Sequence, residues 1–117
     1  MIGPEASRLS IRFYATANGR EPVREWLVHL DRPTMRVIGQ DLRTVQLGWP
    51  LGMPLVRKLE SGLWEVRINV AAGIVRVLFT MLGVELILLH AFVKKSHAIP
   101  KDDLMLARRR MKEVLRG

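Results

Sequence analysis

The stretch Lys58-Leu59-Glu60-Ser61-Gly62-Leu63-Trp64-Glu65-Val66-Arg67 contains two strand-like runs separated by the turn-forming pair Ser61-Gly62. Two further strand-like runs follow, Gly73-Ile74-Val75-Arg76-Val77 and Leu88-Leu89-His90-Ala91-Phe92-Val93-Lys94-Lys95-Ser96. Each run carries at least one cation. Cations from neighbouring strands can converge on one patch, which a phosphodiester with spreading negative charge would need. The pattern therefore favours an activity directed at RNA.

Working outward, the remaining elements follow from hydrophobic periodicity. Alternation predicts a first strand from Arg8 to Tyr14 and later strands at about 55–60, 63–70, 74–81 and 84–93. Apolar residues at helical spacing predict two helices between the first and second strands: Val23, Trp26, Leu27 and Leu30 in one, and Met35, Ile38, Leu42 and Val45 in the other. A last helix begins after Ile99-Pro100. The predicted order is βααββββα in a single domain, residues 1–117, of the α+β class, with a helical hairpin and an antiparallel-rich twisted sheet.

Charge is distributed unevenly along the 117 residues, whose formal net charge is +8. Residues 1–54 hold 7 basic and 5 acidic side chains, whereas residues 55–117 hold 12 and 6. This bias favours nucleic acid, an anionic membrane or an acidic protein as partner, and it places the functional surface in the second half. The chain has no cysteine and three scattered histidines, so we expect neither a disulfide nor a metal site.

The run from Ile74 to Val93 is apolar enough to raise the question of a membrane span. It contains Arg76, Glu85 and His90, which would be costly in hydrocarbon, and a turn glycine at Gly83. Two buried strands explain the run better. With no signal-peptide pattern at the N-terminus, we expect a soluble, cytoplasmic protein that does not bind membranes.

The ordered set Lys58-Leu59-x-x-Gly62-Leu63-Trp64-Glu65-x-Arg67, Gly73-Ile74-x-Arg76 and His90-x-Phe92-x-Lys94-Lys95 resembles the HigB-like, phage-related branch of the RelE/ParE toxin superfamily. Earlier segments, Gly19-Arg20-x-Pro22-Val23-x-x-Trp26-Leu27 and Gly48-Trp49-Pro50, resemble the same branch. The resemblance implies a RelE-like fold and the toxin of a type II toxin–antitoxin pair, which cleaves mRNA on the ribosome without metal or other cofactor. It also implies a cognate antitoxin of the helix-turn-helix, HigA-like kind.

The same resemblance assigns Arg67, Arg76 and Lys95 to the catalytic site. Arg76 is the expected phosphate clamp on a polar surface, because its guanidinium offers a bidentate fork. The alternative is a surface arginine paired with a carboxylate such as Glu65. Arg67 shares the polar face of its strand, where a cross-strand ion pair is the alternative. Only one of Lys94 and Lys95 can share that face, and the family position favours Lys95.

Proton transfer has two candidates, because the tyrosine of the RelE pattern is absent from this C-terminal segment. One is His97 in the loop before the last helix, because an imidazole ordinarily titrates near neutral pH. The other is Lys95. The alternative for His97 is an exposed loop histidine that takes no part in catalysis. His90 is expected to be a hydrogen-bonded core residue and His29 a helix-surface residue. Further RNA-binding candidates are the cations Lys58, Lys94, Arg108, Arg109 and Arg110.

The arginine run of the last helix also fits a solvated face or a dock for an acidic antitoxin segment. For the whole chain, two other functions stay open. One is a non-enzymatic ParE-like inhibitor of DNA gyrase, and the other is an inactive phage-derived nucleic-acid-binding module. The three share a fold, so fold cannot choose among them.

Overall fold

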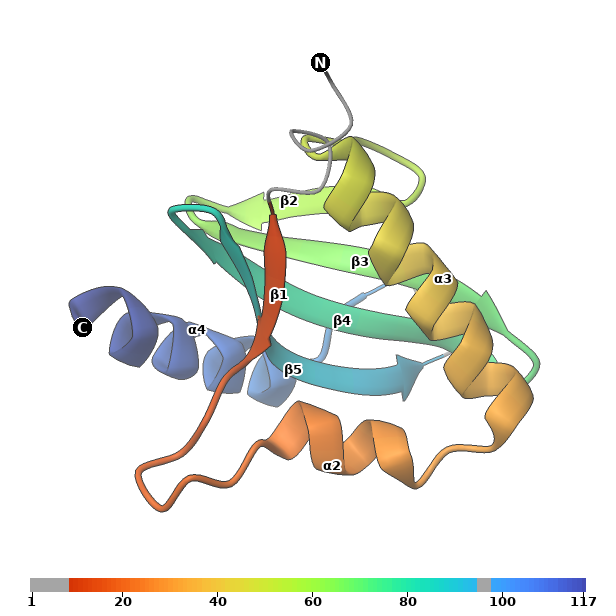
Figure 1. The fold of residues 1–117 in the computed structure, drawn as a ribbon, viewed down its shortest axis with the longest axis horizontal. Helices are drawn as coiled ribbons and strands as arrows, with labels where there is room; N and C mark the ends of the chain where they lie inside the picture. The colour runs from red at the N-terminus through yellow and green to blue at the C-terminus, as the bar shows by residue number, and fades with distance from the viewer. Residues whose placement is uncertain (1–8, 95–97) are drawn as a thin grey trace.

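The computed structural model describes residues 9–94 and 98–117. Within these ranges the elements are β1 (Ser10–Phe13), α2 (Pro22–Val28), α3 (Arg32–Gly48), β2 (Val56–Glu60), β3 (Leu63–Val70), β4 (Gly73–Leu82), β5 (Glu85–Lys94) and α4 (Lys101–Arg116). This is the predicted βααββββα order, and the α+β class is confirmed (Figure 1). The arrangement is consistent with a RelE-like fold. Arg8, predicted to begin the first strand, lies outside the described residues.

The five strands form one twisted mixed sheet in the order β1-β5-β4-β3-β2. Neighbours from β2 to β5 are antiparallel, whereas β1 pairs parallel to β5. The last strand, expected to be central, is an inner strand, and β4 takes the middle place. The long apolar run is therefore the pair β4 and β5, both largely buried. No helix in the described part of the chain is long and apolar enough to span a membrane.

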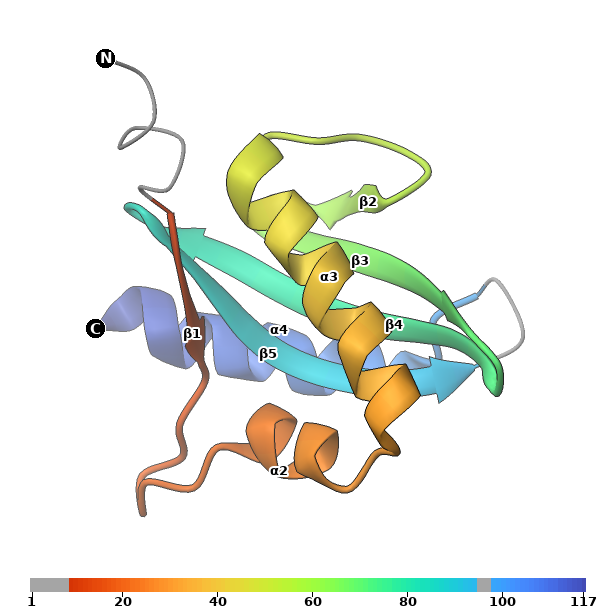
Figure 2. The same ribbon diagram turned by 45° about the vertical axis from the view of Figure 1, so that its right-hand side comes forward.

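Helices cover both faces of the sheet. In Figure 2, α3 crosses one face and α4 lies behind the other. The larger core lies between the sheet and the helices α2 and α3, and includes Ile38, Val66 and Phe79. A smaller core, with Leu63 and Ala107 among its members, lies between the sheet and α4. A residue's place in the strand alternation thus decides which core or surface it joins.

The two predicted helices of the hairpin form for local reasons. The Asp31 carboxylate caps α3 by accepting a hydrogen bond from the Thr34 N–H at 3.1 Å. The α3 residues Ile38, Leu42 and Val45 are buried as their spacing predicts. Pro22 lies in the first turn of α2, where a backbone N–H would have no hydrogen-bond partner within the helix, so proline removes no bond there.

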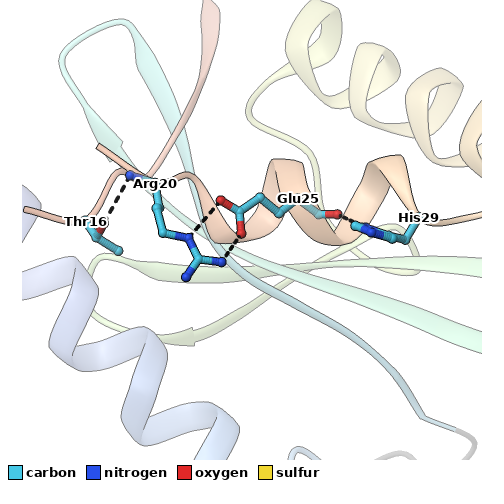
Figure 3. A network of polar contacts seen from close by, with 4 residues as sticks. All are labelled: Thr16, Arg20, Glu25 and His29. Atoms are coloured by element: carbon cyan, nitrogen blue, oxygen red, sulfur yellow. Dashed lines mark hydrogen bonds and ion pairs between the residues drawn. The ribbon is translucent and has the colours of Figure 1, made fainter. Parts of the chain in front are cut away.

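The segment that leads into α2 is held by the polar network of Figure 3. Gly19 adopts a φ of 85°, which favours glycine, in a turn where the Arg20 N–H donates to the Thr16 hydroxyl. The Arg20 guanidinium then pairs with Glu25 at 2.6 Å. His29 at the end of α2 is exposed and bonds the Glu25 carbonyl, so its predicted surface position is confirmed. These contacts give the Gly19-Arg20-x-Pro22 motif a structural role.

The loop after α3 is anchored by an aromatic cluster. Trp49 packs edge-on against Trp64, with ring centroids 5.1 Å apart, and against Phe79 at 5.5 Å. Trp64 and Phe79 stack on each other at 5.8 Å. The anchored loop then leads into β2, which forms the outer edge of the sheet next to β3.

Candidate functional site

Strand register brings two of the predicted catalytic arginines together. Arg67 on β3 lies directly opposite Arg76 on β4, and Arg76 lies opposite Phe92 on β5. Opposite residues of antiparallel strands project to the same side of a sheet. Arg67 and Arg76 therefore share the face on which α4 packs, as the alternation of β3 predicts.

Glu65 stands at the centre of this face, two residues before Arg67. Its Oε2 accepts a hydrogen bond from a terminal nitrogen of Arg76 at 2.8 Å. Its Oε1 lies 3.2 Å from Nε of Arg57 and 4.0 Å from Nε of Arg67. Three guanidinium groups thus surround one carboxylate. We call Arg57, Glu65, Arg67 and Arg76 the arginine cluster.

The expectation that Arg76 lies on a polar surface is wrong. Its side chain is 0% exposed, as is that of Glu65. A buried guanidinium is stable only when its charge is compensated, and the Glu65 carboxylate supplies that compensation. The pair with Glu65 that the alternative named is present, but it is buried. In this structure, Arg76 supports the cluster from inside.

Arg57 is the member of the cluster that the sequence pattern does not single out. Counting back from the Ser61-Gly62 turn would place Lys58 opposite Glu65, but an irregularity between Lys58 and Glu60 shifts the register. Arg57 therefore lies opposite Glu65. Lys58 lies opposite Trp64, on the face covered by α2 and α3, so this RNA-binding candidate is separate from the cluster. A bulge of this kind has no reliable signal in sequence.

On β5, the lysine that shares the cluster's face is Lys94. It lies opposite Ile74, two residues from the Phe92–Arg76 pair, and is exposed. Lys95 and His97 both lie outside the described residues, so their predicted roles stay predictions.

The arginine run of α4 does not act as one surface. The Arg108 guanidinium pairs with Glu60 of β2 at 2.8 Å. Arg110 donates to the Leu89 carbonyl at 2.8 Å and stacks over the Tyr14 ring, and burial lowers its pKa. Arg109 is exposed. Successive helical residues are about 100° apart, which sends the three side chains in different directions. Arg108 and Arg109 are therefore both exposed, Arg108 while paired with Glu60, whereas Arg110 is only partly exposed.

His90 contacts α4. Its Nε2 lies 2.6 Å from an Asp103 carboxylate oxygen, and its ring packs 5.4 Å from that of Phe92. The predicted hydrogen bond is confirmed, but the His90 side chain is partly exposed and is not a core residue. Among the described residues, no three His, Cys, Asp or Glu side chains cluster as a metal site would require.

A shallow hollow adjoins the cluster beside Arg67. Its volume is about 240 Å³, and its other lining residues are Pro54, Asn69 and Ile74. Pro54 comes from the loop before β2, so three segments enclose a space next to a cation. The site thus combines three arginines around a central carboxylate with an open space beside Arg67.

The chain was compared with models of known protein families. Residues 25–112 match the family model described as phage derived protein Gp49-like (DUF891). The match extends from α2 to α4 and includes every member of the arginine cluster. No curated protein matches the chain.

Proposed function

The chain belongs to the phage derived protein Gp49-like family, and from this premise we propose that it is the toxin of a type II toxin–antitoxin pair. Its activity in this proposal is metal-independent, ribosome-dependent cleavage of mRNA. The motif resemblance to HigB-like members of the RelE/ParE superfamily supports the proposal, and so does the βααββββα fold. Its partners are the ribosome with its mRNA and a helix-turn-helix antitoxin.

One observation carries the proposal: side chains from three adjacent strands gather positive charge on one face around a single carboxylate. RNA cleavage by transesterification requires that the 2′-OH lose a proton, that the charged phosphorane be stabilised and that the leaving 5′-oxygen gain a proton. Preorganised guanidinium groups serve the second need. Arg67 takes that role here, while buried Arg76 holds Glu65.

Proton transfer falls to Lys95 or His97 in this proposal. Of the two described histidines, His90 contacts Asp103. His29 lies at the end of α2 and contacts the Glu25 carbonyl. The ribosome would position the mRNA. Because the chain supplies charge and the ribosome supplies substrate geometry, a domain of this size is sufficient.

The test is to induce the chain alone in bacteria and map the 5′ ends of cellular mRNA. We expect growth arrest with new 5′ ends inside translated regions. The same map made with Arg67→Ala should lose most of these ends, since removal of one charge-stabilising donor costs roughly 10²–10³-fold in rate. Arg43→Ala, which removes an exposed arginine from α3, is the matched control.

Plasmid topology measured in the same cells separates the rival function. Intact mRNA together with altered plasmid supercoiling would contradict the proposal and favour a gyrase inhibitor. Intact mRNA and unaltered topology would instead favour an inactive nucleic-acid-binding module.

A further inference from the structure

A basic stripe runs along the outer side of α3, which packs on the opposite face of the sheet from the arginine cluster. Its members follow one another at intervals of three or four residues, so they lie along one side of the helix. They are Arg32, Arg36, Gly39, Arg43 and Leu47, and all are exposed. In Figure 2, α3 lies in front of the sheet, and no described helix or strand lies outside it. We call these residues the α3 stripe.

The arginines of the α3 stripe have no carboxylate partner among the described residues. No ion pair in this part of the chain includes Arg32, Arg36 or Arg43. Within α3 the only acidic residue is Asp41, which instead lines a hollow beside Pro54. The stripe therefore presents three guanidinium groups to carboxylates of another molecule.

Gly39 occupies the middle of the α3 stripe. Glycine in a helix interior is less favourable than other residues, because it loses more backbone freedom on folding. Its φ is not positive, and a Cβ added at Gly39 would meet no atom within 4 Å. Nothing in the described structure therefore requires a glycine here. What the glycine provides is a gap on the outer surface, where a second helix can approach α3 closely. At one end of the stripe, Leu47 adds an apolar side chain that is 44% exposed.

We propose that the α3 stripe is a docking surface for an acidic amphipathic helix of another protein, with Gly39 at the point of closest approach. Carboxylates at helical spacing match the three arginines, and an apolar side chain of the partner covers Leu47. RNA matches the stripe less well, because phosphates need neither the gap at Gly39 nor the apolar contact. A second copy of the chain is also a poor match, since the chain itself has a net charge of +8. The inference does not depend on the proposed cleavage of mRNA.

Fluorescence anisotropy with a labelled, alanine-rich helical peptide tests this surface. In the probe peptide, glutamates and one leucine repeat the spacing of the α3 stripe. One reference peptide has glutamine in place of each glutamate, and the other has the same composition with the glutamates spread around the helix. The wild-type protein should bind the striped peptide more tightly than either reference, with an affinity that falls as the salt concentration rises.

Two substitutions separate the charge of the stripe from its shape. Arg36→Ala should weaken peptide binding by about two- to fivefold, the range for one exposed ion pair, whereas Arg36→Lys should retain most of the affinity. Gly39→Leu should weaken binding by roughly fivefold or more, because the new side chain fills the gap. It should also keep or raise the melting temperature, since leucine forms helices better than glycine. Arg116→Ala, which removes an exposed arginine from α4, is the matched control.

The inference would be overturned by a wild type that does not prefer the striped peptide, by equal losses in Arg36→Ala and Arg116→Ala, or by wild-type affinity in Gly39→Leu. A parallel titration uses labelled oligouridylate. If Arg36→Ala weakened RNA binding and left peptide binding unchanged, the stripe would be an RNA surface and the inference would be wrong. Arg43→Ala should lose peptide affinity and keep whatever mRNA cleavage the wild type shows, so failure of the docking surface and failure of the proposed nuclease are distinguishable.

Discussion

At the scale of single residues, burial changes what a substitution in the arginine cluster reports. Arg76 and Glu65 are both fully buried and joined at 2.8 Å. Removing one partner leaves the other charge in the interior, which costs more than losing an exposed pair. Loss of cleavage in Arg76→Ala would therefore reflect an altered fold as much as altered chemistry. Arg67, which is partly exposed, is the better residue for a test of mechanism.

The first residue-scale prediction is that Glu65→Gln lowers the free energy of unfolding by about 3–5 kcal/mol. The amide has nearly the same shape, so the change isolates the lost charge opposite buried Arg76. Urea denaturation followed by circular dichroism measures the difference. Glu60→Gln is the matched control, because Glu60 pairs with Arg108 near the surface; its effect should stay below about 1 kcal/mol. Equal losses in the two variants would mean that burial of the Glu65–Arg76 pair is unimportant.

At the scale of elements, α4 is joined to the sheet by polar contacts along its length. Asp103 near its start meets His90, and Arg108 meets Glu60. Toward its end, the Tyr14 hydroxyl donates to Glu113 at 2.5 Å, while Arg110 stacks over the Tyr14 ring. Ala107 and Met111 supply the apolar contact between these points. The C-terminal helix thus depends on partners from β2 and β5 and on Tyr14, which directly follows β1.

The Tyr14–Glu113 contact makes a prediction about alkaline pH. The hydrogen bond to Glu113, followed by burial and the negative charge of Glu113, raises the pKa of Tyr14 above its ordinary value of 10.0. Because the raised value belongs to the folded state, Tyr14 contributes stability that is complete below about pH 10 and is lost as the pH rises through the folded-state pKa. Tyr14 is the chain's only tyrosine, so ultraviolet absorbance of the phenolate reports this residue alone.

In that titration the wild type should ionise at a higher pH than the unfolded chain does in urea. Glu113→Gln removes the carboxylate and should move the midpoint back toward the ordinary value. Lys112→Gln, an exposed neighbour on the same helix, serves as the control and should change it little. A midpoint in the wild type at or below that of the unfolded chain would show that the contact does not persist in solution.

At the scale of the whole molecule, one sheet separates two cores of unequal size. The inner strands β3, β4 and β5 have strand neighbours on both sides, whereas β1 and β2 are edges. The buried faces of β4 also belong to both cores, through Val77 and Phe79 on one side and Leu78 on the other. Opening β4 therefore disturbs both layers at once.

This arrangement predicts a gradient of amide hydrogen exchange across the sheet. Amides in β4 should exchange most slowly, at a rate limited by global unfolding, and those in β1 and β2 fastest among the strands. Exchange followed by mass spectrometry or NMR measures the order. If β2 proved as protected as β4, the place of β2 at the edge of the sheet would be wrong.

The sequence by itself determined the elements and their order. Alternation in β3, helical spacing in α3 and turn-forming pairs such as Ser61-Gly62 are local patterns, and local sterics and burial of one face are enough to interpret them. The shared face of Arg67 and Arg76 also followed from alternation, once the strands were known to be neighbours.

Only the tertiary structure decided which cations meet and which are buried. The shift of register in β2 brings Arg57 to Glu65 and sends Lys58 to the other face. The exposure of Arg76 depends on every element packed around it, and no spacing within one strand encodes that number. Register and burial arise from contacts between segments far apart in the chain, so the composition of the site could be read from the sequence only in part.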